Sequence, residues 1–369
     1  MYHKVDRQLS TKKELTMIIP LLRTLYHPED PAHDLIFDAR ELHTEIREHS
    51  IGAQVYHLLK TAGIEINVSS SFHELLYRSY ETGFLQSLLI KRETEKLLKE
   101  FENQGVPVIP LKGTILAERY YGHYAARGTS DIDLLIHPEH LEAAVKCVRK
   151  CGFNTTSQEN PVHYHHEWFK QASGLPEPLA VELHWSLVQS DTSQMNMGAA
   201  WTTSEPLTDY KNVRVLSPSY TFYTLCLHGA SHQMDSLKYV VDLLHMLERH
   251  HEQIDFTWVL KQADLDHTRR RIGAALSVVS QFLPDLASLQ GIAYEHIHIY
   301  NQKSRLYRLL FTLSMLDSWR YRWIFIARLI IPSQRLALYS LGTDGRRKSW
   351  VSIYYNLYKQ RFRKLWGGQ

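Results

Sequence analysis

The stretch LKGTILAERYYGHYAARGTSDIDLLI, residues Leu111 to Ile136, decides how the fold of this chain is interpreted. Its last six residues alternate acidic and aliphatic side chains before becoming fully apolar, which predicts a strand that enters a hydrophobic core. Residues two apart in a strand project from the same face, so Asp131 and Asp133 should present their carboxylates side by side. We expect a helix to open at Pro138 and to end at Gly152, which completes a strand and helix unit.

Two neighbouring carboxylates repel each other unless a cation lies between them. Without a cation the pKa of one carboxyl group would rise until it held a proton, whereas Mg²⁺ prefers carboxylate and phosphate oxygens and removes the conflict. The run VELHWSL, Val181 to Leu187, predicts a second strand, on which Glu182 supplies a third carboxylate. We therefore predict that Asp131, Asp133 and Glu182 are catalytic residues that bind Mg²⁺ or Mn²⁺ for a two-metal, phosphoryl-type transfer.

A turn into a helix, just upstream of the acids, has features suited to phosphate. Gly113 allows close backbone approach and exposes N–H groups, and Thr114 adds a hydroxyl. Lys112 and Arg127 carry positive charges that would neutralise phosphates as pyrophosphate leaves. Either cation could instead form a surface ion pair that contributes little.

Three further residues are candidates for binding the nucleotide. His184 follows Glu182 by two positions and shares its strand face, where it would bind the acceptor or hydrogen-bond a carboxylate. Lys238 and Asp242 lie one helical turn apart. They are expected either to pair with each other along the helix or to face the nucleotide cleft.

These residues, in this order, resemble the polymerase-β-type nucleotidyltransferase superfamily, whose signature is Gly with a small hydroxyl residue or Gly, then Asp-x-Asp, then a later acidic strand residue. The chain is more similar to a bacterial branch of uncharacterised nucleotidyltransferases. That branch has Lys-Gly before a helix, Arg shortly before Asp-Ile-Asp-Leu-Leu, and a later acidic-Leu-His-Trp run. Lys112-Gly113, Arg127, Asp131–Leu135 and Glu182–Trp185 occupy these positions, and Leu225–Met246 is similar to the helical segment that follows the branch's core.

Thr114 departs from the superfamily pattern, which prefers Ser or Gly, and the gap from Thr114 to Asp131 is longer than usual. The resemblance implies a metal-dependent enzyme that transfers a nucleotidyl or related group from a nucleoside triphosphate, or another nucleotide donor, to a hydroxyl or phosphate acceptor. The acceptor is not identified, and a peptide or a small molecule fits. The alternatives are a tailoring transferase that uses a nucleotide-sugar donor on a phosphorylated peptide, and a non-catalytic nucleotide-binding scaffold or sensor.

Helical periodicity dominates both flanks of this region. Leu85, Leu88 and Leu97 belong to a predicted apolar stripe before Gly105, and Ser217-Pro218 opens a further helical series. We predict an α+β fold, with a small mixed-sheet nucleotidyltransferase core between helical regions. The expected divisions are an N-terminal helical region (1–104), the α/β core (105–216) and a C-terminal helical region with a basic aromatic tail (217–369).

For several histidines and cysteines the sequence predicts no metal site. His228 and His232 lack a third ligand and predict a polar helix face, and the run His163–His166 is interpreted as incidental. Cys147 and Cys151 lack further zinc ligands at suitable spacing. With only 3 cysteines in 369 residues and no recognisable export signal, we expect a cytoplasmic protein.

The overall composition fits a globular protein, with 44% hydrophobic and 22% charged residues and a net charge of +3. The apolar run Trp323–Pro332 is about half the length needed to span a bilayer, so we expect a buried helix and no membrane span. The last part of the chain interleaves Arg and Lys with Trp and Tyr, including Arg346–Lys348. Such a mixture can bind RNA, but amphipathic packing explains it equally well, so nucleic acid is not the favoured partner.

Overall fold

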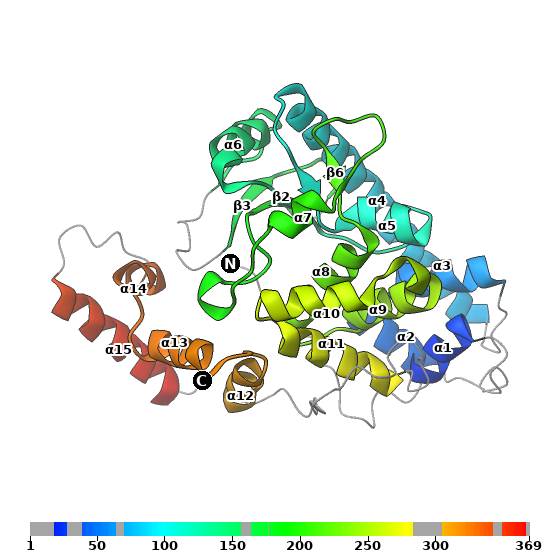
Figure 1. Ribbon diagram of the computed structural model, residues 1–369. Coiled ribbons are helices and arrows are strands. Elements are labelled where there is room, and N and C mark those ends of the chain that lie inside the picture. The colour runs from blue at the N-terminus through cyan, green and yellow to red at the C-terminus, as the bar shows by residue number, and fades with distance from the viewer. Residues whose placement is uncertain are drawn as a thin grey trace.

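The computed structural model describes residues 18–27, 39–63, 70–155, 164–175, 177–282, 305–341 and 349–366. It has a mixed α+β fold, 65% helical, in which helices flank a small mixed sheet of 4 strands (Figure 1). The fold class predicted from the sequence is therefore confirmed. The Arg346–Lys348 run and His163 lie outside the described residues.

The sheet has the strand order β1-β2-β4-β3. Strand β2 (Asp131–Leu135) pairs in parallel with β4 (Leu179–His184), whereas β1 (Ile109–Pro110) and β3 (His165–Lys170) each pair antiparallel with their neighbour. Strand β4 starts and ends earlier than the predicted Val181–Leu187. A separate pair, β5 (Glu205–Pro206) and β6 (Arg214–Val215), lies beside the sheet.

Alternation along the strands gives the sheet one apolar and one polar face. Ile132, Leu134, Val181 and Leu183 are buried on one side, in a cluster that includes side chains of the two helices behind the sheet. These helices are α4 (Ser70–Asn103) and α6 (Leu141–Lys150), which follows the short turn η2 (Pro138–His140). Burying each such aliphatic side chain contributes about 1.5–3 kcal/mol. The acidic residues between them are thereby turned to the opposite face.

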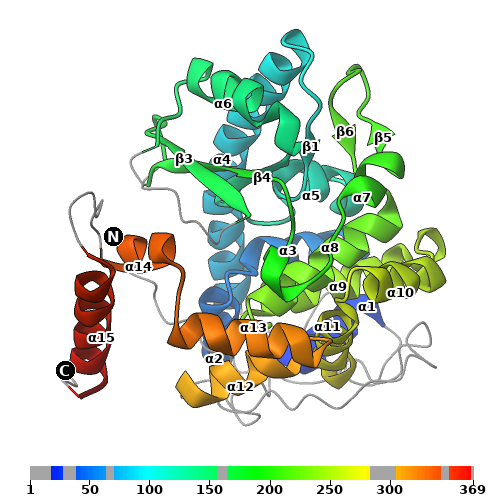
Figure 2. The same ribbon diagram turned by 60° about the vertical axis from the view of Figure 1, so that its left-hand side comes forward.

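The helical regions before and after the sheet share one hydrophobic core. Figure 2 shows the early and late helices packed together below the sheet, with the long α4 running past both. The bounds are α1 (Ile18–Tyr26), α2 (Ala39–Glu48), α3 (Gly52–Ala62), α5 (Gly113–Tyr121), η3 (Ser190–Thr192), α7 (Gly198–Thr202), α8 (Pro218–Ser231), α9 (Leu237–Arg249), η4 (His251–Gln253), α10 (Phe256–Leu265) and α11 (Arg269–Phe282).

The apolar stripe predicted along α4 is only partly correct. Leu97 is buried over the sheet, but Leu85 and Leu88 are 58% and 44% exposed. The helical spacing correctly predicted that these residues belong to one helix. It could not show that the sheet covers only the later turns of a helix of 34 residues.

The C-terminal helices are α12 (Arg305–Ser314), α13 (Trp319–Ile330), α14 (Gln334–Leu341) and α15 (Trp350–Trp366). Figure 1 shows them at one side of the molecule, away from the sheet. The expectation of a buried helix over Trp323–Pro332 is wrong, because Trp323 is 63% exposed and Ile330 is 57% exposed. None of the described helices is long and apolar enough to cross a membrane.

Candidate active site

Three carboxylates meet on the polar face of the sheet. Asp133 of β2 lies directly opposite Glu182 of β4 in the parallel register, and Asp131 is two residues earlier on the same face. Each of the three offers an oxygen, and these oxygens all lie within 4.8 Å of one another. Asp133 is buried, and the other two are partly exposed. The structure therefore brings together the residues predicted to bind metal.

The crowded negative charge changes the protonation of the two aspartates in opposite directions. Burial and the adjacent Asp133 raise the pKa of Asp131. Burial would also raise the pKa of Asp133, but the Lys112 ammonium and the hydrogen bond from His184 outweigh it and hold that pKa well below its usual range. Lys112 Nζ lies 2.9 Å from Asp133 Oδ2. Lys112 is therefore a direct counter-ion of Asp133.

His184 connects the two strands of the acidic cluster. Its Nε2 lies 3.0 Å from both Asp133 Oδ1 and Glu182 Oε2. Burial would lower the pKa of His184, but its hydrogen bonds with these two carboxylates raise it to about 9. The raised pKa favours the protonated ring, whose Nε2–H lies between the two acids. The sequence allowed His184 either to bind the acceptor or to hydrogen-bond a carboxylate, and the contacts in the structure are those with carboxylates.

A histidine from the neighbouring strand also reaches this cluster. His165 Nε2 is 3.8 Å from Glu182 Oε2, and His165, Glu182 and His184 form a second group with the spacing of metal ligands. The His163–His166 run, interpreted from the sequence as incidental, therefore contains one residue, His165, that lies beside Glu182. The missed signal is strand alternation, because His165 and Glu167 face the same side as Glu182.

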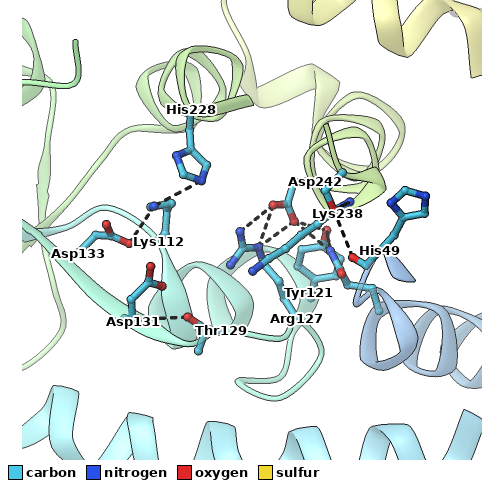
Figure 3. Close-up of polar contacts among 12 residues, drawn as sticks. His49, Lys112, Tyr121, Arg127, Thr129, Asp131, Asp133, His228, Lys238 and Asp242 are labelled. Atoms are coloured by element: carbon cyan, nitrogen blue, oxygen red, sulfur yellow. Dashed lines mark hydrogen bonds and ion pairs between the residues drawn. The ribbon is translucent and has the colours of Figure 1, made fainter. Parts of the chain in front are cut away.

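The turn before α5 lies beside the acids, as Figure 3 shows for Lys112 at its start. Lys112 is the N-cap residue, in an extended conformation. Gly113 follows with φ of +75°, which a residue with a side chain rarely adopts. The buried Thr114 hydroxyl has no hydrogen-bond partner among the described residues. The helix start thus offers backbone N–H groups close to the strand that carries Asp131.

Arg127 and Asp242 form a buried ion pair next to the site (Figure 3). Arg127 Nε donates to Oδ1 and Oδ2 of Asp242 at 2.8 and 2.9 Å, and Nη2 is 2.8 Å from Oδ2. Tyr121 Oη and Gln54 Nε2 donate to Oδ1 at 3.0 and 3.1 Å. Each partner is 2% exposed. The ion-pair partner of Asp242 is therefore Arg127 and not Lys238, because the fold brings α9 against the loop that carries Arg127.

Lys238 lies in the same part of the site, close to Arg127 in Figure 3. Burial and the positive charge of Arg127 lower the pKa of Lys238 to about 8, against the opposing effect of Asp131. A bound anion would offset the repulsion from Arg127 and would therefore stabilise the protonated form of Lys238.

A small pocket adjoins the cluster and is lined by Leu111, Lys112, Tyr164, His184, Leu187, Thr224, His228 and Ser231. His228 Nε2 is 3.4 Å from Lys112 Nζ. Burial and that ammonium lower the pKa of His228 well below its usual value, so the neutral ring accepts the lysine's hydrogen bond. The predicted polar helix face holds for exposed His232 but not for His228, which lines this pocket. Its partner Lys112 is 116 residues away in the sequence.

Comparison with known proteins gives one finding about the family. No curated protein and no solved structure matches this chain. A family model described as an uncharacterised nucleotidyltransferase matches residues 37–284, which include the sheet, all three carboxylates and helices α8 to α11. By this match over more than half of its length, the chain belongs to that uncharacterised nucleotidyltransferase family.

Proposed function

We propose that this chain is a divalent-metal-dependent enzyme that transfers a nucleotidyl or related phosphorus-containing group from a nucleotide donor to a hydroxyl or phosphate acceptor. One observation carries the proposal: Asp131, Asp133 and Glu182 converge from two neighbouring parallel strands, with one oxygen of each inside 4.8 Å. The family assignment supports transfer from a nucleotide.

The residues present fit a hard divalent cation. Asp131, Asp133 and Glu182 offer only oxygen ligands, which Mg²⁺ and Mn²⁺ prefer. The raised pKa of Asp131 reflects burial and like-charge repulsion that a cation would relieve. These three carboxylates would hold the ion, which would supply Lewis-acid polarisation of the phosphate and stabilisation of charge on the leaving group.

The surrounding cations have distinct positions relative to the donor. Lys112 lies against Asp133 and at the N-cap of α5, so a bound phosphate would draw its ammonium away from the carboxylate. The N–H groups at the start of α5, with the Thr114 hydroxyl, which has no hydrogen-bond partner in the described part of the chain, would then bind phosphate oxygens. Lys238 adds a further ammonium. Arg127 is held by Asp242 and would contribute a fixed charge rather than a mobile clamp.

The test compares the protein with the double variant Asp131→Asn/Asp133→Asn, using Glu167→Gln as the matched control. Glu167 is a carboxylate on the same sheet face, paired across the sheet with Glu182 but outside the group of three. Calorimetry with Mn²⁺ alone should show binding to the wild type and the control, and at least a tenfold loss in the double variant. Equal Mn²⁺ affinity in all three proteins would refute the metal site.

The donor is identified by mass spectrometry of candidate peptide, RNA and small-molecule acceptors after incubation with nucleoside triphosphates or nucleotide sugars. A nucleotidyl adduct that depends on the two aspartates supports the proposal. A hexose adduct would instead establish the tailoring transferase that uses a nucleotide sugar. Nucleotide binding without consumption of any donor would refute catalysis and leave a nucleotide sensor.

A further inference from the structure

The net charge of +3 is the sum of an acidic first part of the chain and a strongly basic C-terminal part. Residues 305–369 contain 13 Lys and Arg but only 2 Asp and no Glu, whereas the preceding 304 residues contain 29 Lys and Arg against 37 Asp and Glu. The basic segment also lies beyond residue 284, where the family match ends. The nucleotidyltransferase core therefore does not account for it.

Helix α13 presents an apolar stripe to solvent. Trp319, Trp323 and Ile330 are 73%, 63% and 57% exposed, and their spacing of four and seven residues places them on one side of the helix. The opposite side faces the protein through buried Tyr321 and through Arg328, which pairs with Asp191 of η3. These contacts fix the rotation of α13, so its apolar stripe is held outward.

Helix α15 continues this surface. Tyr358 Oη donates to the carbonyl of Ile330, and Arg361 donates to the carbonyl of Leu329, so the end of α13 lies against α15. Val351 and Tyr355 are 80% and 64% exposed on α15. Helix α12 adds two exposed residues of the same kind, Leu306 and Leu310.

Exposed basic residues accompany these apolar side chains. They include Arg320 beside Trp319, and Lys359 and Arg363 on α15. We define the C-terminal patch as a set of exposed apolar and basic side chains chosen from α12, from α13 with its C-cap residue, and from α15: Leu306, Leu310, Trp319, Arg320, Trp323, Ile330, Ile331, Val351, Tyr355, Lys359 and Arg363.

We propose that the C-terminal patch docks on the surface of a membrane that contains anionic phospholipids. Trp and aliphatic side chains on basic helices are suited to the boundary between headgroups and acyl chains, and Lys and Arg are attracted to the negative surface. Single-stranded RNA would be bound by stacking on aromatic rings, which gives no role to exposed Ile330, Ile331 and Val351. The charge and the aliphatic content together favour lipid.

Flotation of the full chain with lipid vesicles tests this proposal, with one set of pure phosphatidylcholine and one of equal parts phosphatidylcholine and phosphatidylglycerol. The wild type should float with the anionic vesicles, with a blue shift of tryptophan fluorescence, and bind the neutral ones weakly. Trp319→Ser/Trp323→Ser should reduce the partition coefficient by about tenfold or more. Arg320→Gln and Lys359→Gln should each reduce it by roughly fivefold.

The control variant is Leu85→Ser/Leu88→Ser, which removes two exposed apolar side chains from α4, outside the C-terminal patch. It should float like the wild type, and unaltered thermal unfolding of every variant will show that the fold is intact. Vesicle binding that is absent, or equal for the patch and control variants, overturns the proposal. So does salt-sensitive binding of a single-stranded RNA without vesicle binding, or self-association in sedimentation that the tryptophan substitutions abolish.

Discussion

The buried ion pair of Arg127 and Asp242 allows a stringent test of how the site is built. The substitution Asp242→Asn keeps the size of the side chain and an oxygen that can accept from Tyr121 and Gln54. It removes the negative charge opposite Arg127 and replaces Oδ2, which accepts from Arg127, by an amide NH2 group that can only donate. Because both partners are 2% exposed, the guanidinium would remain buried without a counter-ion.

Loss of one partner of a buried, hydrogen-bonded ion pair costs about 3–5 kcal/mol, mostly because the other charge stays desolvated. We expect Asp242→Asn to lower the free energy of unfolding by this amount. The double variant Arg127→Met/Asp242→Leu removes both charges and leaves only the Tyr121 hydroxyl without its acceptor, at about 1–3 kcal/mol, because Gln54 still has Tyr121 Oη within 3.5 Å. We therefore expect it to lose less stability than Asp242→Asn.

Urea unfolding, followed in parallel by tryptophan fluorescence and circular dichroism, measures these differences. The control is Asp264→Asn, whose carboxylate is 64% exposed and 3.7 Å from Arg269, and which should change stability by less than about 1 kcal/mol. The reasoning is refuted if Asp242→Asn is as stable as this control. A stable Asp242→Asn protein with weakened nucleotide binding would show that Asp242 acts on the donor, as the sequence allowed.

Three further predictions concern other parts of the fold. Burial lowers the pKa of His245 from 6.5 to about 4, so its stabilising contribution is complete above pH 6.5 and is lost as the pH falls toward 4; His245→Phe should flatten the dependence of unfolding free energy on pH in this window, and an unchanged slope would contradict this. Gly113→Ala should lower the free energy of unfolding by about 1–2 kcal/mol because φ at this position is +75°. Gly273→Ala in helix α11 has open space around the added methyl group and should slightly raise the free energy of unfolding; thermal unfolding of both variants measures the difference. Arg328→Met removes the ion pair to Asp191 and should speed hydrogen exchange in α13 while leaving exchange in β2 unchanged; equal exchange in α13 would show that the pair does not hold this helix.

Local sequence patterns were sufficient for the strand that carries two of the catalytic candidates. Asp131 and Asp133 share one face of β2, and Ile132 and Leu134 are buried on the other. This follows from backbone geometry alone, because successive side chains of a strand point to opposite faces. The α+β class follows similarly from the different periodicities of the central and flanking segments.

Pairing between distant segments could not be obtained in this way. The strand around Glu182 was predictable, but its parallel register with β2 places Glu182 opposite Asp133 only after the sheet has assembled. The order of the motifs along the sequence predicted that Glu182 joins the two aspartates, but only the assembled sheet places its side chain beside Asp133. Strand alternation puts His165 and Glu167 on one face of β3, but only the pairing of β3 with β4 brings that face to Glu182.

The amino-acid sequence by itself determined the periodicity of each element and hence which side chains share a face. Tertiary structure alone decided what each face contacts. Asp242 pairs with Arg127, which is 115 residues away in the sequence, and Trp323 is exposed although it begins an apolar run of the sequence. The physical reason is that face sharing depends on the geometry of neighbouring residues. Burial and charge pairing depend on which helices and strands pack together across the whole chain.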